Sequence, residues 1–148
     1  MARHIFTILC ESASIDSITN GLTLTKIIEG FGVSPEPQAG QTVMVPMSAM
    51  IVTVAMRDDS DVPESVPFRI DLVYPDGTSV AGPIAMLDLS SAPRTRNLMT
   101  VQGFGVKGLG VHKFVVYFGN NSDGEFTCVG EWIFAVMLPP SEAQRQPA

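Results

Sequence analysis

The chain has 148 residues, of which 45% are hydrophobic and 16% are charged, and its formal net charge is −6. This length and composition predict one globular domain with a sizeable core. The surplus of acidic residues argues against binding to nucleic acid or to an anionic membrane surface, because both need a basic patch. No segment approaches the roughly 20 consecutive apolar residues that a membrane-spanning helix needs.

The first apolar run, Ile5–Cys10, is too short for the hydrophobic region of a secretory signal peptide. The two cysteines, Cys10 and Cys128, are far apart and have no CxxC spacing, which predicts reduced thiols. Together these features predict a cytoplasmic protein.

The first half of the chain reads as strands separated by turns. A β-rich run, His4–Cys10, precedes a polar, Ser-rich loop over Glu11–Asn20. Leu22–Val33 resumes the alternation, and its glycines predict a bulge. Val43–Met56 is a long apolar run whose β-branched residues favour a strand covered on both faces over a helix.

The second half continues in the same way. Val66–Tyr74 alternates clearly, whereas Thr78–Leu89 is a weaker strand that Gly82-Pro83 interrupts. Asn97–Val106 and Val111–Phe118 follow, and a polar turn then leads into a last strand that stops at the proline pair Pro139-Pro140. In this last strand, one apolar face is predicted to hold Phe126, Cys128, Trp132, Phe134 and Val136.

About eight strands with regularly spaced turns predict an all-β fold. We expect a single antiparallel β-sandwich, similar to an immunoglobulin or jelly-roll domain, over residues 1–140. Residues 141–148 are predicted to be a frayed tail. No window shows a convincing helical pattern with capping residues.

In such a sandwich, successive connections alternate between the two ends of the molecule. Nine of the fifteen acidic residues fall in the odd-numbered connections. We therefore expect one acidic end, formed by the loops Glu11–Asn20, Arg57–Ser65, Asp88–Arg96 and Gly119–Glu125.

One of these loops is a candidate metal site. Asp58, Asp59, Asp61 and Glu64 offer several oxygen ligands from one flexible segment, as Ca²⁺ requires. Their spacing does not fit the EF-hand pattern, because Pro63 occupies a ligand position. The alternative is a solvated acidic loop without a metal.

Other motifs are read as structural. Gly103–Gly108 matches GxGxxG, but a strand follows it where a dinucleotide site needs a helix. Gly77–Ala81 approaches a nucleophile elbow but opens a strand, and only His4 and His112 could act as its base. We therefore expect neither catalysis nor a cofactor.

The run Val43–Met56 contains four methionines. In one interpretation they belong to the core, and in the other they form an adaptable contact surface or a subunit interface. These residues are Met44, Met47, Met50 and Met56.

The first 30 residues or so carry a resemblance. Ile5–Glu11, which is a short strand ending in Cys and an acid, is followed by Asn20–Leu24 with its Gly-Leu-x-Leu pattern and by Ile27–Gly30. This arrangement resembles the opening of a family of small bacterial proteins of unknown function. The resemblance implies a β-sandwich and no assigned chemistry.

The expectation from the sequence is thus a non-catalytic interaction or structural module. Its partner would be another protein, bound by the loops, or a second copy in a homodimer formed through a sheet face or a sheet edge. The alternative is a calcium-dependent binding domain that uses the acidic loop Asp58–Glu64.

Overall fold

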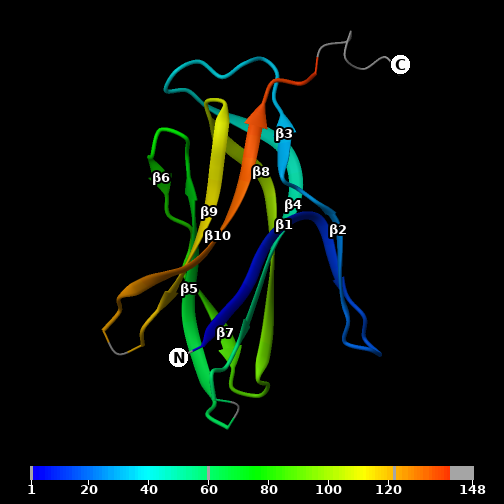
Figure 1. The fold of residues 1–148 in the computed structure, drawn as a ribbon, viewed down its shortest axis with the longest axis vertical. Helices are drawn as coiled ribbons and strands as arrows, with labels where there is room; N and C mark the ends of the chain where they lie inside the picture. The colour runs from blue at the N-terminus through cyan, green and yellow to red at the C-terminus, as the bar shows by residue number, and fades with distance from the viewer. Residues whose placement is uncertain (1, 60, 122, 141–148) are drawn as a thin grey trace.

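A computed structural model describes residues 2–59, 61–121 and 123–140. These residues form ten strands in two sheets that pack face to face, and they contain no helix (Figure 1). The all-β fold predicted from the sequence is therefore confirmed. No helix in the described part of the chain could cross a membrane. The predicted tail, residues 141–148, lies outside the described residues.

The first sheet, sheet A, has four strands, all antiparallel to their neighbours. Its order is β2 (Leu22–Ile27), β1 (Arg3–Ile15), β4 (Thr42–Met56) and β8 (Arg94–Lys107). Strand β4 is the centre of this sheet, and β8 is one of its edges.

The second sheet, sheet B, has six strands. Five follow one another in the order β3 (Gly30–Gly32), β10 (Phe126–Met137), β9 (Gly110–Gly119), β5 (Glu64–Val73) and β6 (Ser79–Val80), and β7 (Ala85–Leu89) also pairs with β5. Strands β3 and β10 are parallel, so the prediction of a wholly antiparallel sandwich is wrong at this pair. The cause is the chain after β2, which crosses from sheet A to sheet B without reversing direction (Figure 1).

Two of the eight predicted runs are each divided into two strands. Leu22–Val33 is split into β2 and β3, and Thr78–Leu89 is split into β6 and β7. The predicted loop at Glu11–Asn20 is wrong over its first half, because β1 continues to Ile15 and forms a ribbon with β2. Polar residues are tolerated in this ribbon, since much of it is exposed to solvent.

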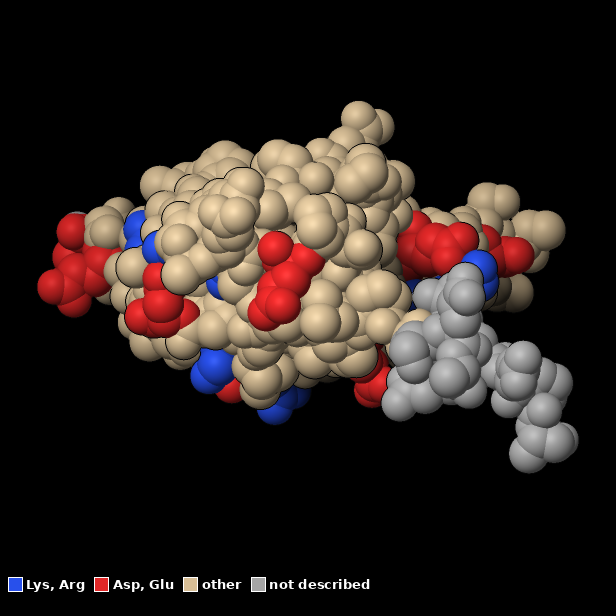
Figure 2. Space-filling view, turned by 90° about the horizontal axis from the view of Figure 1, so that it is seen from above, with Lys and Arg blue, Asp and Glu red and all other residues tan. Residues whose placement is uncertain are grey.

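The predicted acidic end is present. Figure 1 places the turns after β1, β4, β7 and β9 in the lower half of the molecule, where they are spread across its width. Glu11 is the exception among the nine acids, because it lies in β1 four residues before the end of the strand, where it pairs with Lys26 at 3.0 Å. Figure 2 looks onto the opposite end, where uncharged residues cover most of the central surface.

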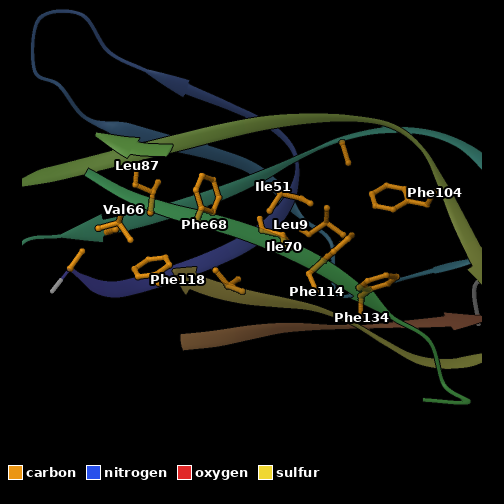
Figure 3. Packing of buried hydrophobic residues seen from close by; sticks show 14 of the residues in the cluster. Leu9, Ile51, Val66, Phe68, Ile70, Leu87, Phe104, Phe114, Phe118 and Phe134 are labelled. Carbon is orange, nitrogen blue, oxygen red and sulfur yellow. The ribbon is translucent and has the colours of Figure 1, made fainter. Parts of the chain in front are cut away.

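The main core lies between the two sheets (Figure 3). Its centre is a group of stacked and tilted aromatic rings around Phe134, whose ring centroid is 5.2 Å from that of Phe114 and 5.9 Å from that of Phe31. Phe68 and Phe118 extend the core toward the acidic end and are almost fully buried. Aromatic side chains of this kind bury the most apolar area per residue.

A second, smaller core covers the outer face of sheet A. Leu22 and Leu24 of the β1–β2 hairpin pack onto Cys10, Val52 and Val54, which are almost completely buried. The hairpin therefore folds across the outer face of sheet A. This confirms the prediction that the strand containing Val52 is covered on both faces.

In the last strand, β10, one side chain lies on the opposite face of the sheet from the predicted one. A register shift between Cys128 and Gly130 inserts an extra residue into β10, which reverses the alternation of side chains. As a result, Phe134 and Val136 point into the core, whereas Cys128 is exposed on the outer face of sheet B. The prediction that Cys128 is buried beside Phe134 is wrong for this reason.

The aromatic core makes a stability prediction. We expect Phe134→Ala to lower the free energy of unfolding by about 3–5 kcal/mol, because it opens a cavity among the stacked rings. Ile133→Ala is the matched control, since the neighbouring side chain is half exposed and should cost less than about 1 kcal/mol. Urea denaturation monitored by circular dichroism measures both. Equal losses in the two variants would contradict the described core.

Candidate functional site

The two sheets leave one side of the sandwich open. Strand β8, at the edge of sheet A, faces the β6 and β7 edge of sheet B across this side. Between them lies an apolar groove of about 370 Å³. We call it the edge groove, and its lining residues are Thr42, Met44, Ile51, Ile70, Leu72, Tyr74, Val80, Ala81, Gly82, Pro83, Met99, Val101, Gly105 and Phe114.

The groove exists because the outer edge of β5 is paired discontinuously. Strand β6 pairs only with Leu72 and Val73, and β7 pairs only with residues 64–68. Between the two strands the chain leaves the sheet at Gly82-Pro83. A Cβ atom on Gly82 would collide with the carbonyl oxygen of Ile70, so glycine allows the crossing segment to lie against β5.

One end of the edge groove is fastened by ionic contacts. Lys107, the last residue of β8, forms a salt bridge of 2.7 Å with Asp76 and donates a hydrogen bond to the Thr78 hydroxyl group. The Lys107 and Thr78 hydrogen bonds hold the pKa of Asp76 below its ordinary value. The Lys107 ammonium group also lies 5.9 Å from the centre of the Tyr74 ring. These contacts hold the β5–β6 turn against the end of β8.

The floor and the rims of the groove differ in exposure. Ile51, Ile70 and Phe114 form a buried floor that is continuous with the main core. The rims carry Met44, which is 64% exposed, and Val80, which is 55% exposed. Large apolar side chains at the mouth of an apolar groove are typical of contact surfaces.

The β8 edge itself has little protection. Residues 97–102 pair with β4 in an unbroken register, and within the described residues no strand pairs with their other side. The stretch Asn97–Val106 has no charged side chain. Natural edge strands usually carry central charges, prolines or strong bulges that block further pairing. The stretch has neither a charge nor a proline, and its pairing with β4 shifts register only between Gln102 and Phe104.

A larger hollow of about 560 Å³ lies beside the crossing from β2 to β3. Its walls combine apolar residues such as Phe31 and Met47 with the Glu11–Lys26 ion pair. These two charges satisfy each other, and the neighbouring strand edge belongs to the short ribbon of β1 and β2. This hollow therefore lacks the long free strand edge that lies beside the edge groove.

The predicted calcium ligands lie at the acidic end. Asp59 accepts a hydrogen bond from the backbone N–H of Asp61 at 3.0 Å, and Glu64 begins β5 opposite Leu89. Among the residues that the structure describes, no three His, Cys, Asp or Glu side chains are grouped so that they could hold a metal ion. The calcium site stays a prediction from the sequence, which calorimetric titration with Ca²⁺ can test.

The glycine motifs have structural positions. Gly103 and Gly105 lie within β8, and Gly108 lies in the turn before β9, so the strand expected after this motif is present. Ser79, the central residue of the second motif, is exposed in the two-residue strand β6.

His112 is a buried framework residue. Its Nε2 atom accepts a hydrogen bond from the backbone N–H of Lys107 at 3.3 Å, and its Nδ1 atom lies 3.2 Å from the Gly110 carbonyl oxygen. This geometry fits a neutral ring that carries its proton on Nδ1 and donates it to Gly110. Burial lowers the pKa of His112, and the Gly110 bond opposes that shift.

His4 is also part of the framework. Its Nε2 atom lies 2.9 Å from the Thr7 hydroxyl group, which in turn lies 3.0 Å from the hydroxyl group of buried Thr53. Burial lowers the pKa of His4 as well. His112 thus has both ring nitrogens engaged inside the domain, and His4 has its Nε2 atom engaged.

The four methionines do not form one surface. Met44 lines the edge groove, Met47 packs against the main core and Met50 packs in the second core. The sulfur of Met56 accepts a hydrogen bond from Arg3. Only Met44 therefore keeps the interpretation as an exposed contact residue.

No known family model matches the chain, and no characterised protein matches it in sequence. Two solved structures with a distant likeness are β-glucosidases, from Listeria innocua and from Kluyveromyces marxianus. The first has 13% identity and a TM-score of 0.41 over 70% of this chain and 15% of that chain. The second has 9% identity and a TM-score of 0.39 over 78% of this chain and 17% of that chain. The chain spans about a sixth of either protein, and a likeness this distant says nothing of its function.

The edge groove was not foreseen from the sequence, although two signals pointed to its parts. The interruption at Gly82-Pro83 marks the place where the outer pairing of β5 is lost. The uncharged stretch Asn97–Val106 marks the unprotected edge. Neither signal states that the two features face each other, because that depends on how the sheets pack.

The buried histidine makes stability depend on pH. Because the pKa of His112 in the folded chain lies below its ordinary value of 6.5, the unfolded chain binds more protons at mildly acidic pH. We expect the free energy of unfolding to change little between pH 7 and pH 7.5 and to fall below pH 6.5, with a limiting slope of about 1.4 kcal/mol per pH unit for His112. His4, whose pKa is also lowered by burial, adds to the fall in the same range.

The control is His112→Gln, measured by urea denaturation between pH 7.5 and pH 5. Its stability should fall less steeply than that of the wild type over this range. The carboxyl groups of Asp16, Asp76 and Asp88 have lowered pKa values and stay ionised there, so they do not contribute. If the free energy of unfolding had the same pH dependence in both proteins, His112 would not be the residue responsible.

Proposed function

We propose that the chain is a non-catalytic interaction module that binds a protein partner, or a second copy of itself, at its open side. The observation that carries the proposal is the edge groove lying directly beside the unpaired edge of β8. We also propose that the protein is cytoplasmic, because Cys10 and Cys128 are free thiols and the cytoplasm keeps thiols reduced.

Two sources of binding energy meet at this side. Covering the rims at Met44 and Val80 would remove apolar surface from water at about 25 cal/mol for each Å². The unpaired main-chain N–H and C=O groups of β8 offer hydrogen bonds to an added strand. An apolar groove next to a free sheet edge combines these two contributions over a short distance.

Binding has better support than catalysis. A hydrolase site at Ser79 would need a nearby base, yet His4 and His112 are held by framework hydrogen bonds. In contrast, the lining of the edge groove is predominantly apolar, which suits the packing of another polypeptide.

A site-specific photo-crosslinker tests the proposal. With p-benzoylphenylalanine at Met44 on the groove rim, irradiation of the cells that make the protein should give discrete crosslinked products. The same group at Ile133, on the outer face of sheet B and also about half exposed, should give few. Equal crosslinking from both positions, or a strictly monomeric protein by light scattering with no products from Met44, would sink the proposal.

A further inference from the structure

We infer that the occupant of the open side is an extended segment of another protein that adds as a strand to β8. The segment carries two acidic residues spaced two apart and, three residues further along, two apolar residues spaced two apart. This inference rests on the proposed binding function and specifies the chemistry of the partner.

The pattern follows from the two faces of β8. Arg94 and Arg96 lie on the outer face of sheet A, because they pair with Met56 and with Val54 of the second core. Met99 and Val101 have the opposite parity, and both line the edge groove. A strand added to β8 would place its side chains beside these same residues, in the same alternation.

The positive charge of β8 favours acidic residues in the segment that pairs with it. The strand Arg94–Lys107 has three cationic side chains and no acidic one, in a chain whose net charge is −6. Lys107 is neutralised by Asp76. Within the described residues, Arg94 and Arg96 are in no salt bridge, and Arg96 donates only to the neutral side-chain oxygen of Asn20 at 2.9 Å.

The two arginines also border space that a side chain can enter. They line two adjoining hollows of about 210 Å³ and 350 Å³ beneath the β1–β2 hairpin. The smaller hollow has polar walls from Asn20 and Thr95, which suit a carboxylate. Guanidinium groups bind carboxylates through paired, charge-assisted hydrogen bonds.

A second copy of the chain fits this edge less well. Two β8 edges related by a two-fold axis would run antiparallel, and the centred register would place Arg94 of one copy opposite Lys107 of the other. Like charges directly opposite each other are destabilising. Strand β8 contains no acidic residue that could meet Arg94 or Arg96.

The occupant's apolar residues would fill the groove. Side chains beside Met99 and Val101 would reach the floor formed by Ile51, Ile70 and Phe114. In a parallel arrangement the segment reads acid-x-acid-x-x-apolar-x-apolar, and in an antiparallel arrangement it reads the same pattern in reverse. The two orders have different sequences, so the direction of addition can be measured.

Two synthetic peptides, one for each order, test the inference. Both have glutamate at the acidic positions, valine at the apolar positions and threonine elsewhere, and fluorescence anisotropy measures their binding to the full chain. We expect one order to bind, and its glutamine counterpart to bind about tenfold more weakly because two charge pairs are lost. N-methylation of alternate backbone amides, on the side that faces β8, should abolish binding.

Variants of the protein locate the peptide. Val101→Lys should abolish binding, whereas Ile133→Lys on the far sheet should leave it unchanged. The double variant Arg94→Gln with Arg96→Gln should bind the glutamate and glutamine peptides equally. Circular dichroism and melting temperature establish that each variant is folded.

The outcomes separate this inference from the proposed function. Crosslinking from Met44 without binding of either peptide would overturn the strand pattern and leave the binding function standing. The inference would also be overturned if the glutamate and glutamine peptides bound equally to the wild type. Binding of the N-methylated peptide, or binding to the Val101→Lys variant, would overturn it too. Crosslinking of the chain to its own copies from Met44 would show that the occupant is a second copy.

Discussion

The structure depends on how the two sheets are joined. On one side of the sandwich a chain segment bridges them, and on the other side a groove separates their edges. On the closed side, the chain between β2 and β3 is hydrogen bonded to both sheets. The backbone N–H of Ile28 bonds to the Leu9 carbonyl oxygen of sheet A, and the Glu29 carbonyl oxygen accepts a bond from Ala135 of sheet B. The Trp132 indole N–H adds a third bond, to the Ile28 carbonyl oxygen. On the open side the chain crosses between the sheets at the short connection from β7 to β8. The described residues provide no such crossing between β8 and β6, so the groove stays open there.

The β1–β2 hairpin determines which surfaces of sheet A remain free. By folding over Cys10, Val52 and Val54, it converts the outer face of the sheet into a second core. Strand β4 then has buried residues on both faces, as strands in the middle of layered folds do. Sheet A ends at β2 on one side and at β8 on the other, and β8 is the longer of these two edge strands.

The sequence predicted the elements better than their junctions. Alternation along Val66–Tyr74 and the double-sided run at Val43–Met56 were enough to define strands and their covered faces. The reversal at Cys128 could not be foreseen, because an inserted residue at a bulge leaves the composition of the strand unchanged. The edge groove requires that Gly82 and Val101, which are distant in sequence, face each other, and periodicity contains no information about such packing.

An unprotected edge strand must be kept from pairing with the same strand of other copies. Here two electrostatic effects of different range act together. Copies that each carry a net charge of −6 repel one another at distances up to the Debye length, which is about 8 Å at physiological salt.

Within a sheet, however, side chains on neighbouring strands lie only about 5 Å apart, so a local charge pair is screened less than the long-range repulsion. Arg94 and Arg96 can therefore attract a carboxylate once a strand is aligned on β8, although the molecule as a whole repels acids. The same residues disfavour a second β8, which has only cations to offer. The proposed selectivity for a foreign acidic strand would thus rest on placing two arginines at the β8 edge of an otherwise acidic molecule.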